Sequence, residues 1–171
     1  LAIRFNTKFG DTFKIPEGYI LKAGSKIYDL QEPTNKMSKS AGSVAGVLEI
    51  MDTPEANTKK IKSATTDAGR EVTFDEKGKP GISNLLTIHS ALSGKSVADL
   101  ENEFAGKGYG DFKGAVAEVV VEYLRPIRTQ ALELLQDEAH LIKVLHDGAD
   151  KARAVASATL AQTYKNLGLV L

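Results

Sequence analysis

Two lysines and three serines crowd one short stretch, TNKMSKSAGS, at residues 34–43. Lysine ammonium groups are compact, mobile positive charges, and serine hydroxyls donate short directional hydrogen bonds. Lys36 and Lys39 lie three residues apart with Ser38 and Ser40 beside them, so the four side chains could surround a polyphosphate. Serine and lysine also make up ordinary solvated linkers. The stretch alone therefore leaves a phosphate-binding loop and a linker as alternatives, although a chance match to KMSKS is rare.

Short extended segments are expected on both sides of this stretch. Residues 26–30, KIYDL, are typical of a short strand leading directly into the loop, and residues 46–52, GVLEIMD, form a second apolar run. Pro33 disfavours helix at the residue before it. Gly42 and Gly46 have no side chain to restrict the backbone, so we expect them to let the loop move.

No other cluster offers comparable chemistry. The three histidines have no second ligand-type residue at a known metal spacing, so a structural role is favoured for each. They are His89, His140 and His146. The carboxylate pair at 75–76 lies in a turn-like context. GKGYG at residues 106–110 lacks both the preceding strand and the GK[ST] of a phosphate loop, which favours a connector between helices.

The composition is that of a globular chain without a strong overall field. Of the 171 residues, 42% are hydrophobic and 26% are charged, which argues against disorder. Because 22 basic residues balance 22 acidic ones, any nucleic acid must be bound by a local patch. The absence of cysteine excludes disulfides, thiolate metal sites and a cysteine nucleophile. No apolar run is long enough to span a membrane.

Two helices are expected before residue 65. Leu1, Phe5 and Phe9 form one stripe of a helix that is already under way, so we expect the chain to be the carboxy-terminal part of something longer. A second helix is predicted over residues 54–64 from an N-cap threonine followed by proline. The lysines of this helix, Lys59, Lys60 and Lys62, are interpreted as a solvated face.

Residues 65–81 are rich in turn formers and contain one strand-like piece, EVTF, so they predict an excursion between two blocks. From there onward the pattern is helical, with a first helix ended by Gly94 and a short second one over SVADLENEF. A stripe through residues 116–135 predicts a long helix kinked at Pro126. At least one more helix follows, with a break near Gly148. Such amphipathic helices favour a bundle.

These segments resemble a known family. KMSKS is the signature loop of the class I aminoacyl-tRNA synthetases, and GSKIYDLQEPTNKMSKS, TKKIKSATTD, KPGISNLLTIHSALSG, FAGKGYGDFK and EYLRPIR are similar to the bacterial tryptophanyl-tRNA synthetases. The likeness covers essentially the whole chain and preserves the order of the motifs. It implies a mainly α fold, in which residues 53–171 form a helical anticodon-binding domain. Residues 1–52 would be the last part of a Rossmann-type catalytic domain.

The resemblance also implies an activity. The family uses ATP with Mg²⁺ to convert L-tryptophan to tryptophanyl-adenylate, releases pyrophosphate, and transfers tryptophan to the 3′ end of tRNA(Trp). A cytoplasmic homodimer with no membrane association is expected for the full-length enzyme. Lys36 and Lys39 would be catalytic, Met37 would lie near the adenine through its backbone, and Ile27 would pack near the nucleotide. The complete ATP-binding set would be Ile27, Lys36, Met37, Ser38, Lys39 and Ser40.

Some of the family pattern is not found here. The HIGH-like ATP motif, the tryptophan pocket and a GxDQ-type segment are expected upstream of Leu1, so this chain alone is expected to be inactive. Ala41 and Gly42 stand where many relatives have acidic or Asn/Pro-containing sequence. Two alternatives stay open, namely a non-catalytic tRNA-binding helical module and the related tyrosyl enzyme. Lys62, Arg125 and Arg128 are candidate tRNA contacts, although ordinary surface charge is the favoured interpretation.

Overall fold

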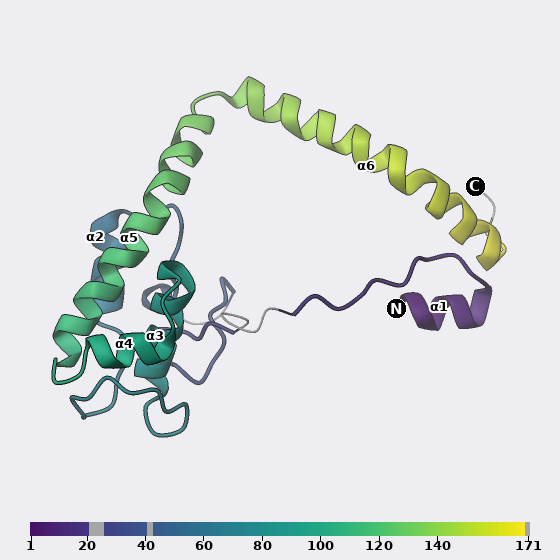
Figure 1. Ribbon diagram of the computed structural model, residues 1–171. Coiled ribbons are helices and arrows are strands. Elements are labelled where there is room, and N and C mark those ends of the chain that lie inside the picture. Colours follow the sequence, from purple (N-terminus) through teal and green to yellow (C-terminus); the bar gives the residue numbers. More distant parts are fainter. Residues whose placement is uncertain (21–25, 41–42, 170–171) are drawn as a thin grey trace. The chain divides into compact units, whose positions relative to one another are not determined.

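The computed structural model describes residues 1–20, 26–40 and 43–169 (Figure 1). Within these ranges the regular structure is helical, and no strand longer than an isolated bridge is formed. The chain divides into two compact units. One contains Leu1–Ile20 and Glu133–Leu171, and the other contains Leu21–Leu132. The mainly α fold expected from the sequence is confirmed, whereas Ala41 and Gly42 lie outside the described residues.

The first unit contains α1 (Ala2–Phe9) and the long helix α6 (Glu138–Leu167). The predicted opening helix is confirmed, and its Phe5 ring packs 4.9 Å from the rings of both Phe9 and Phe13. After α1 the chain returns to α6, where the amide of Asn166 donates a 2.6 Å hydrogen bond to the hydroxyl of Thr12.

The break predicted near Gly148 is wrong, because α6 runs through this residue without interruption (Figure 1). One glycine inside a helix costs only about 1 kcal/mol relative to alanine. The flanking residues, including four alanines between Ala149 and Ala156, are strong helix formers that offset this cost. Asp137 caps the start of α6 by accepting a hydrogen bond from the backbone of His140.

The second unit holds the hydrophobic core. Its helices are α2 (Pro54–Lys62), α3 (Pro80–Ser93), α4 (Val97–Glu103) and α5 (Tyr109–Leu134), of which α5 belongs to it as far as Leu132. Their fully buried apolar side chains form one cluster with Leu30 of the preceding loop. The largest of them are Phe112, Leu30, Ile61, Ile82, Leu85, Leu86, Leu100, Val116 and Val120.

The predicted helix ends in this unit are confirmed. The hydroxyl of Thr53 accepts a hydrogen bond from the backbone of Ala56, and Ser96 caps α4 in the same way. Gly94 ends α3 with φ 75°, in the left-handed region that favours glycine. The first three residues of GKGYG lie between α4 and α5, as expected, whereas Tyr109 and Gly110 already belong to α5. α5 is not ended by Pro126, which lies within it.

The strand-like piece EVTF pairs with no other strand in the described structure. Side chains satisfy the backbone of this excursion instead. Glu101 accepts a hydrogen bond from the backbone N–H of Phe74, and Ser83 accepts one from Asp75. The Asp75 carboxylate then closes the following turn, which confirms a structural context for the 75–76 pair. None of the helices described here is both long enough and apolar enough to cross a lipid bilayer.

Candidate functional site

The KMSKS stretch begins on a short backbone pairing. Tyr28 and Lys36 form an isolated antiparallel bridge. The N–H of Met37 donates to the carbonyl of Ile27 at 3.0 Å, and the N–H of Asp29 donates to the carbonyl of Asn35 at 2.8 Å. The strand predicted over KIYDL is therefore reduced to this one bridge. The bridge fixes the backbone position from which the Lys36 side chain extends.

A second set of hydrogen bonds closes the base of the loop. The N–H of Leu30 donates to the carbonyl of Gly46 at 2.9 Å, so residues before and after the KMSKS stretch are joined directly. The carbonyl of Leu30 in turn accepts the N–H of Thr65 at 2.8 Å. Because Leu30 is also part of the buried core, both ends of the loop are attached to the folded unit.

Gly46 packs closely against Asp29 at the base of the loop. It is buried against the Asp29 carboxylate, and a Cβ placed on Gly46 would lie 2.1 Å from the Asp29 oxygens. The same carboxylate accepts the N–H groups of Gln31 and Glu32 at 2.8 and 3.0 Å. The lack of a side chain at position 46 leaves room for this close approach, and the mobility expected of Gly46 stays a prediction.

The tip of the loop presents the predicted polar groups to solvent. Lys36 and Lys39 are exposed, and no hydrogen bond or ion pair of either ammonium group occurs within the described residues. The hydroxyls of Ser38 and Ser40 lie 3.2 Å apart. Met37 and Ile27 are partly buried and pack against the core, which holds the stretch by its apolar side.

An open groove lies beside the tip and is lined by Met37, Ser38 and Lys39 together with residues 47–51, which include the acidic Glu49. Most of its walls are apolar, and Lys39 supplies a positive charge at its edge. An apolar surface beside ammonium and hydroxyl groups suits a ligand with a flat ring system and a polyphosphate. Three of the six predicted ATP-binding residues, Met37, Ser38 and Lys39, line this groove, and Ile27 is joined to Met37 by a backbone hydrogen bond.

The segment after the loop is held by α2 through a lysine that we expected to be solvated. Lys60 is 9% exposed, and its ammonium group donates to the carbonyl of Val47 at 2.7 Å and to the Asp52 carboxylate at 2.6 Å. The buried Asn57 adds a 3.1 Å hydrogen bond to the carbonyl of Glu49. The interpretation of a solvated face is therefore wrong for Lys60, because two oxygens of the returning chain surround its charge.

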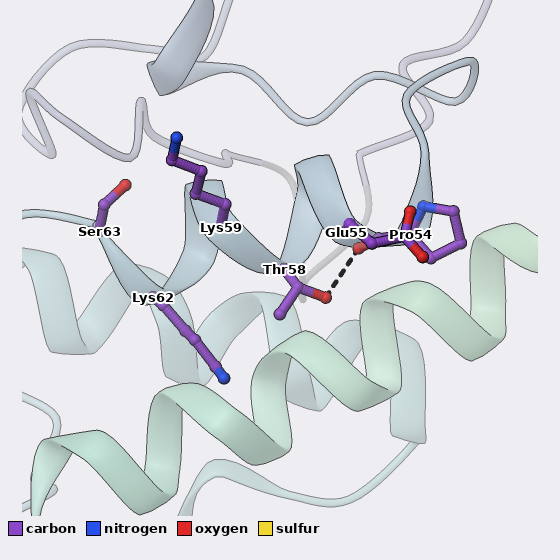
Figure 2. Close-up of a pocket in the computed structure, with 6 residues that line it drawn as sticks. All are labelled: Pro54, Glu55, Thr58, Lys59, Lys62 and Ser63. Atoms are coloured by element: carbon purple, nitrogen blue, oxygen red, sulfur yellow. Dashed lines mark hydrogen bonds between the residues drawn. The ribbon is translucent and has the colours of Figure 1, made fainter.

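A second hollow lies on α2 itself, and Figure 2 shows the six side chains that line it. All come from one helix and the residue after it, and the hydroxyl of Thr58 is occupied by a 2.7 Å hydrogen bond to the carbonyl of Pro54. Lys59 and Lys62 are exposed on this surface, as expected. All the residues that line the hollow belong to this one segment, so we do not assign a ligand site there.

The other residues singled out from the sequence, two arginines and a histidine among them, contact other parts of the protein. Arg125 pairs with Glu122 at 2.9 Å, and Arg128 lies 3.4 Å from the carbonyl of Met51. Burial between Phe104 and Phe112 lowers the pKa of His89, which confirms its structural role. No cluster of three or more His, Cys, Asp or Glu side chains suited to a metal occurs in the part of the chain that the structure describes.

One residue beside the loop was not predicted. Asn84, 3% exposed in the first turns of α3, accepts the N–H of Tyr28 at 2.9 Å and donates to the carbonyl of Tyr28 at 2.8 Å. The available signal was weak: Asn84 is one of several polar residues among the apolar ones of the KPGISNLL segment. Its partner is 56 residues away in the sequence, so periodicity gave no indication of the contact.

Comparison with protein families gives an independent view of this arrangement. Residues 1–125 match the model of the class I tRNA synthetases for tryptophan and tyrosine (W and Y). The tryptophan–tRNA ligase of Leifsonia xyli is 51% identical over 170 residues, which are 99% of this chain and 50% of that relative. Tryptophan–tRNA ligase 2 of Streptomyces avermitilis is 48% identical with the same coverage. The chain spans about half the length of the curated relatives it matches.

Solved structures of tryptophanyl-tRNA synthetases are also similar to this chain. The tryptophanyl-tRNA synthetase of Mycoplasma pneumoniae matches 99% of this chain and 51% of its own, with a TM-score of 0.84 and 34% identity. That of Campylobacter jejuni, solved with ADP and tryptophan, matches 98% of this chain and 51% of its own, with a TM-score of 0.64 and 28% identity.

Proposed function

This chain belongs to the class I tRNA synthetases for tryptophan and tyrosine, and on that premise we propose that it is the carboxy-terminal part of a tryptophan–tRNA ligase. Its part in the reaction is to supply the KMSKS loop and a tRNA-binding helical domain. In the complete enzyme, ATP and L-tryptophan form tryptophanyl-adenylate and pyrophosphate, and tryptophan is then transferred to tRNA(Trp). The relatives named as tryptophan–tRNA ligases favour tryptophan over tyrosine as the substrate.

The observation that supports this function best is the contrast within the loop. Its base is fixed by the Tyr28–Lys36 bridge and the Leu30–Gly46 hydrogen bond, while the ammonium groups of Lys36 and Lys39 face solvent. The fixed base supports the proposal because it holds the backbone at Lys36 in a defined position. The exposure of the two ammonium groups leaves both of them free to contact an anion.

Lys36 and Lys39 act on charge that develops during the reaction. When the tryptophan carboxylate attacks the α-phosphate, the bond to the leaving pyrophosphate breaks and negative charge moves onto that group. Ammonium groups that contact the pyrophosphate more strongly at that moment lower the barrier. Ser38 and Ser40 donate hydrogen bonds to phosphate oxygens. Met37 contacts the region of the adenine through its backbone, and Ile27 packs near the nucleotide.

The other partners follow from the same proposal. Mg²⁺ enters with ATP, as the counter-ion of its phosphates. Residues 1–52 belong to the catalytic domain, and residues 53–171 form the anticodon-binding domain. The complete enzyme is a cytoplasmic homodimer.

The ligase function is tested by tryptophan-dependent ATP–pyrophosphate exchange in the complete protein that contains this chain. Lys36→Ala or Lys39→Ala should each raise the barrier by about 3 kcal/mol, which is roughly a hundredfold in rate. Lys59→Ala is the matched control, since it removes an exposed lysine outside the loop. Unchanged exchange in both loop variants would disprove the assigned roles.

The two alternatives give different results in the same assay. Exchange that depends on tyrosine rather than tryptophan would identify the tyrosyl enzyme. A complete protein that binds tRNA but shows no exchange with either amino acid would identify a non-catalytic binding module.

A further inference from the structure

We propose that Asn84 is a positioning residue for the phosphate loop, acting through the backbone of Tyr28. This inference rests on the proposed ligase function. It adds a residue outside the KMSKS stretch to those that support the activation of tryptophan by ATP. Asn84 lies on α3, far from Lys36 in the sequence, and does not itself contact the predicted phosphate-binding groups.

The first step of the argument is the completeness of the contact. The side-chain carbonyl of Asn84 accepts the N–H of Tyr28 at 2.9 Å, while its amide group donates to the carbonyl of the same residue at 2.8 Å. Both polar groups of one peptide residue are thus satisfied by one side chain, as a neighbouring strand would satisfy them. Asn84 therefore takes the place of a second strand on the side of Tyr28 that faces α3.

The second step is the position of Tyr28. It is the residue whose bridge partner is Lys36, and its neighbours Ile27 and Asp29 make the flanking hydrogen bonds to Met37 and Asn35. If Tyr28 shifts, the register of this bridge shifts with it. The point from which the Lys36 side chain extends is thereby linked to α3.

The third step is the rigidity of the support. Asn84 is 3% exposed and lies between buried residues on both sides, from Ile82 to Leu86. Gly81, one turn earlier, packs so closely on the carbonyl of Thr65 that a Cβ would lie 2.1 Å from it. Because this end of α3 is packed on several sides, it cannot follow a displaced strand without disturbing the core.

The alternative is that Asn84 only stabilises the fold, and its neighbour Ser83 offers a matched control. Ser83 is also 3% exposed and also accepts a backbone N–H, that of Asp75 at 2.8 Å. This contact holds the excursion that precedes α3 and does not involve Tyr28. Ser83→Ala removes a buried hydrogen bond from the same turn of α3. It leaves the contacts of Tyr28 intact.

The experiment compares Asn84→Ala, the isosteric Asn84→Asp and Ser83→Ala in the complete protein, by ATP–pyrophosphate exchange. Asn84→Asp keeps the volume of the side chain and removes the donor to Tyr28, so it serves if the alanine variant fails to fold. Both Asn84 variants should raise the KM for ATP roughly tenfold or more, because a small displacement of a binding group has large effects. The KM for tryptophan should not change.

A purely structural role predicts a different pattern, since loss of folded protein lowers kcat and leaves both KM values unchanged. The proposal would be overturned by that pattern or by a wild-type KM for ATP in a folded Asn84 variant. An equal rise of the KM for ATP in Ser83→Ala would also overturn it.

Amide hydrogen exchange separates this proposal from the ligase function. The amides of Asp29 and Met37 donate the two hydrogen bonds that flank the Tyr28–Lys36 bridge. They should exchange roughly tenfold faster in both Asn84 variants and at the wild-type rate in Ser83→Ala. This result does not depend on any enzymatic activity. If the wild-type protein shows no exchange of pyrophosphate, the proposed function fails, while unchanged amide protection would refute the positioning role by itself.

Discussion

Helices α3 and α6 are stabilised in opposite ways. Each ends at a glycine in the left-handed conformation, Gly94 and Gly168. Eight of the 14 residues of α3 are buried, whereas none of the 30 residues of α6 is. A short helix is marginal in water and relies on packing, while a long one accumulates enough internal hydrogen bonds to persist. Sequence changes in the two helices should therefore have very different consequences.

The largest contrast is expected between two leucines. Leu86 of α3 is fully buried and Leu145 of α6 is 71% exposed. Leu86→Ala should lower the free energy of unfolding by about 2–5 kcal/mol because it leaves a cavity in the core. Leu145→Ala should change it by less than about 0.5 kcal/mol. Urea denaturation, with amide exchange followed separately for each helix, measures both, and equal losses would contradict the comparison.

A pair of glycines should give effects of opposite sign. Gly81→Ala places a methyl group against the backbone of Thr65, so we expect a loss of about 1–3 kcal/mol from overpacking. Gly148 lies inside α6, and a Cβ added there would meet nothing within 4 Å, so Gly148→Ala should stabilise α6 by about 0.5–1 kcal/mol. Thermal unfolding followed by circular dichroism reports both. Destabilisation by Gly148→Ala would show that α6 needs the glycine.

A smaller effect should distinguish α3 by its pH dependence. Burial lowers the pKa of His89, so the folded state prefers the neutral imidazole more than the unfolded state does. The resulting contribution is fully present above the unfolded pKa of about 6.5 and is lost as the pH falls from there through the lower folded value. Stability measured between pH 7.5 and about 5 should fall, and His89→Gln should reduce the slope. A variant with the same slope as the wild type would exclude His89 as its source.

The features that could be predicted from the sequence are local ones. Thr53, Ser96 and Gly94 mark helix ends because their effects involve only the next few residues. KMSKS was identified because the motif is contiguous, and its exposed lysines agree with that interpretation.

The features that were missed depend on contacts between distant segments. Lys60 was predicted to be a surface lysine because its contacts with Val47 and Asp52 are made by a segment outside its own helix. The close packing of Gly46 against Asp29 was not predicted. Asn84 had no sequence signature because its partner is a backbone, which any residue type supplies. In each case the missing information was which segment would lie opposite.

The hydrogen bond between Leu30 and Gly46 has a thermodynamic consequence for ATP binding. Bringing the two ends of a chain together costs conformational entropy, and here that cost is met when the protein folds. Affinity for ATP should therefore depend on how tightly the base of the loop is closed, even though the base makes no contact with the nucleotide.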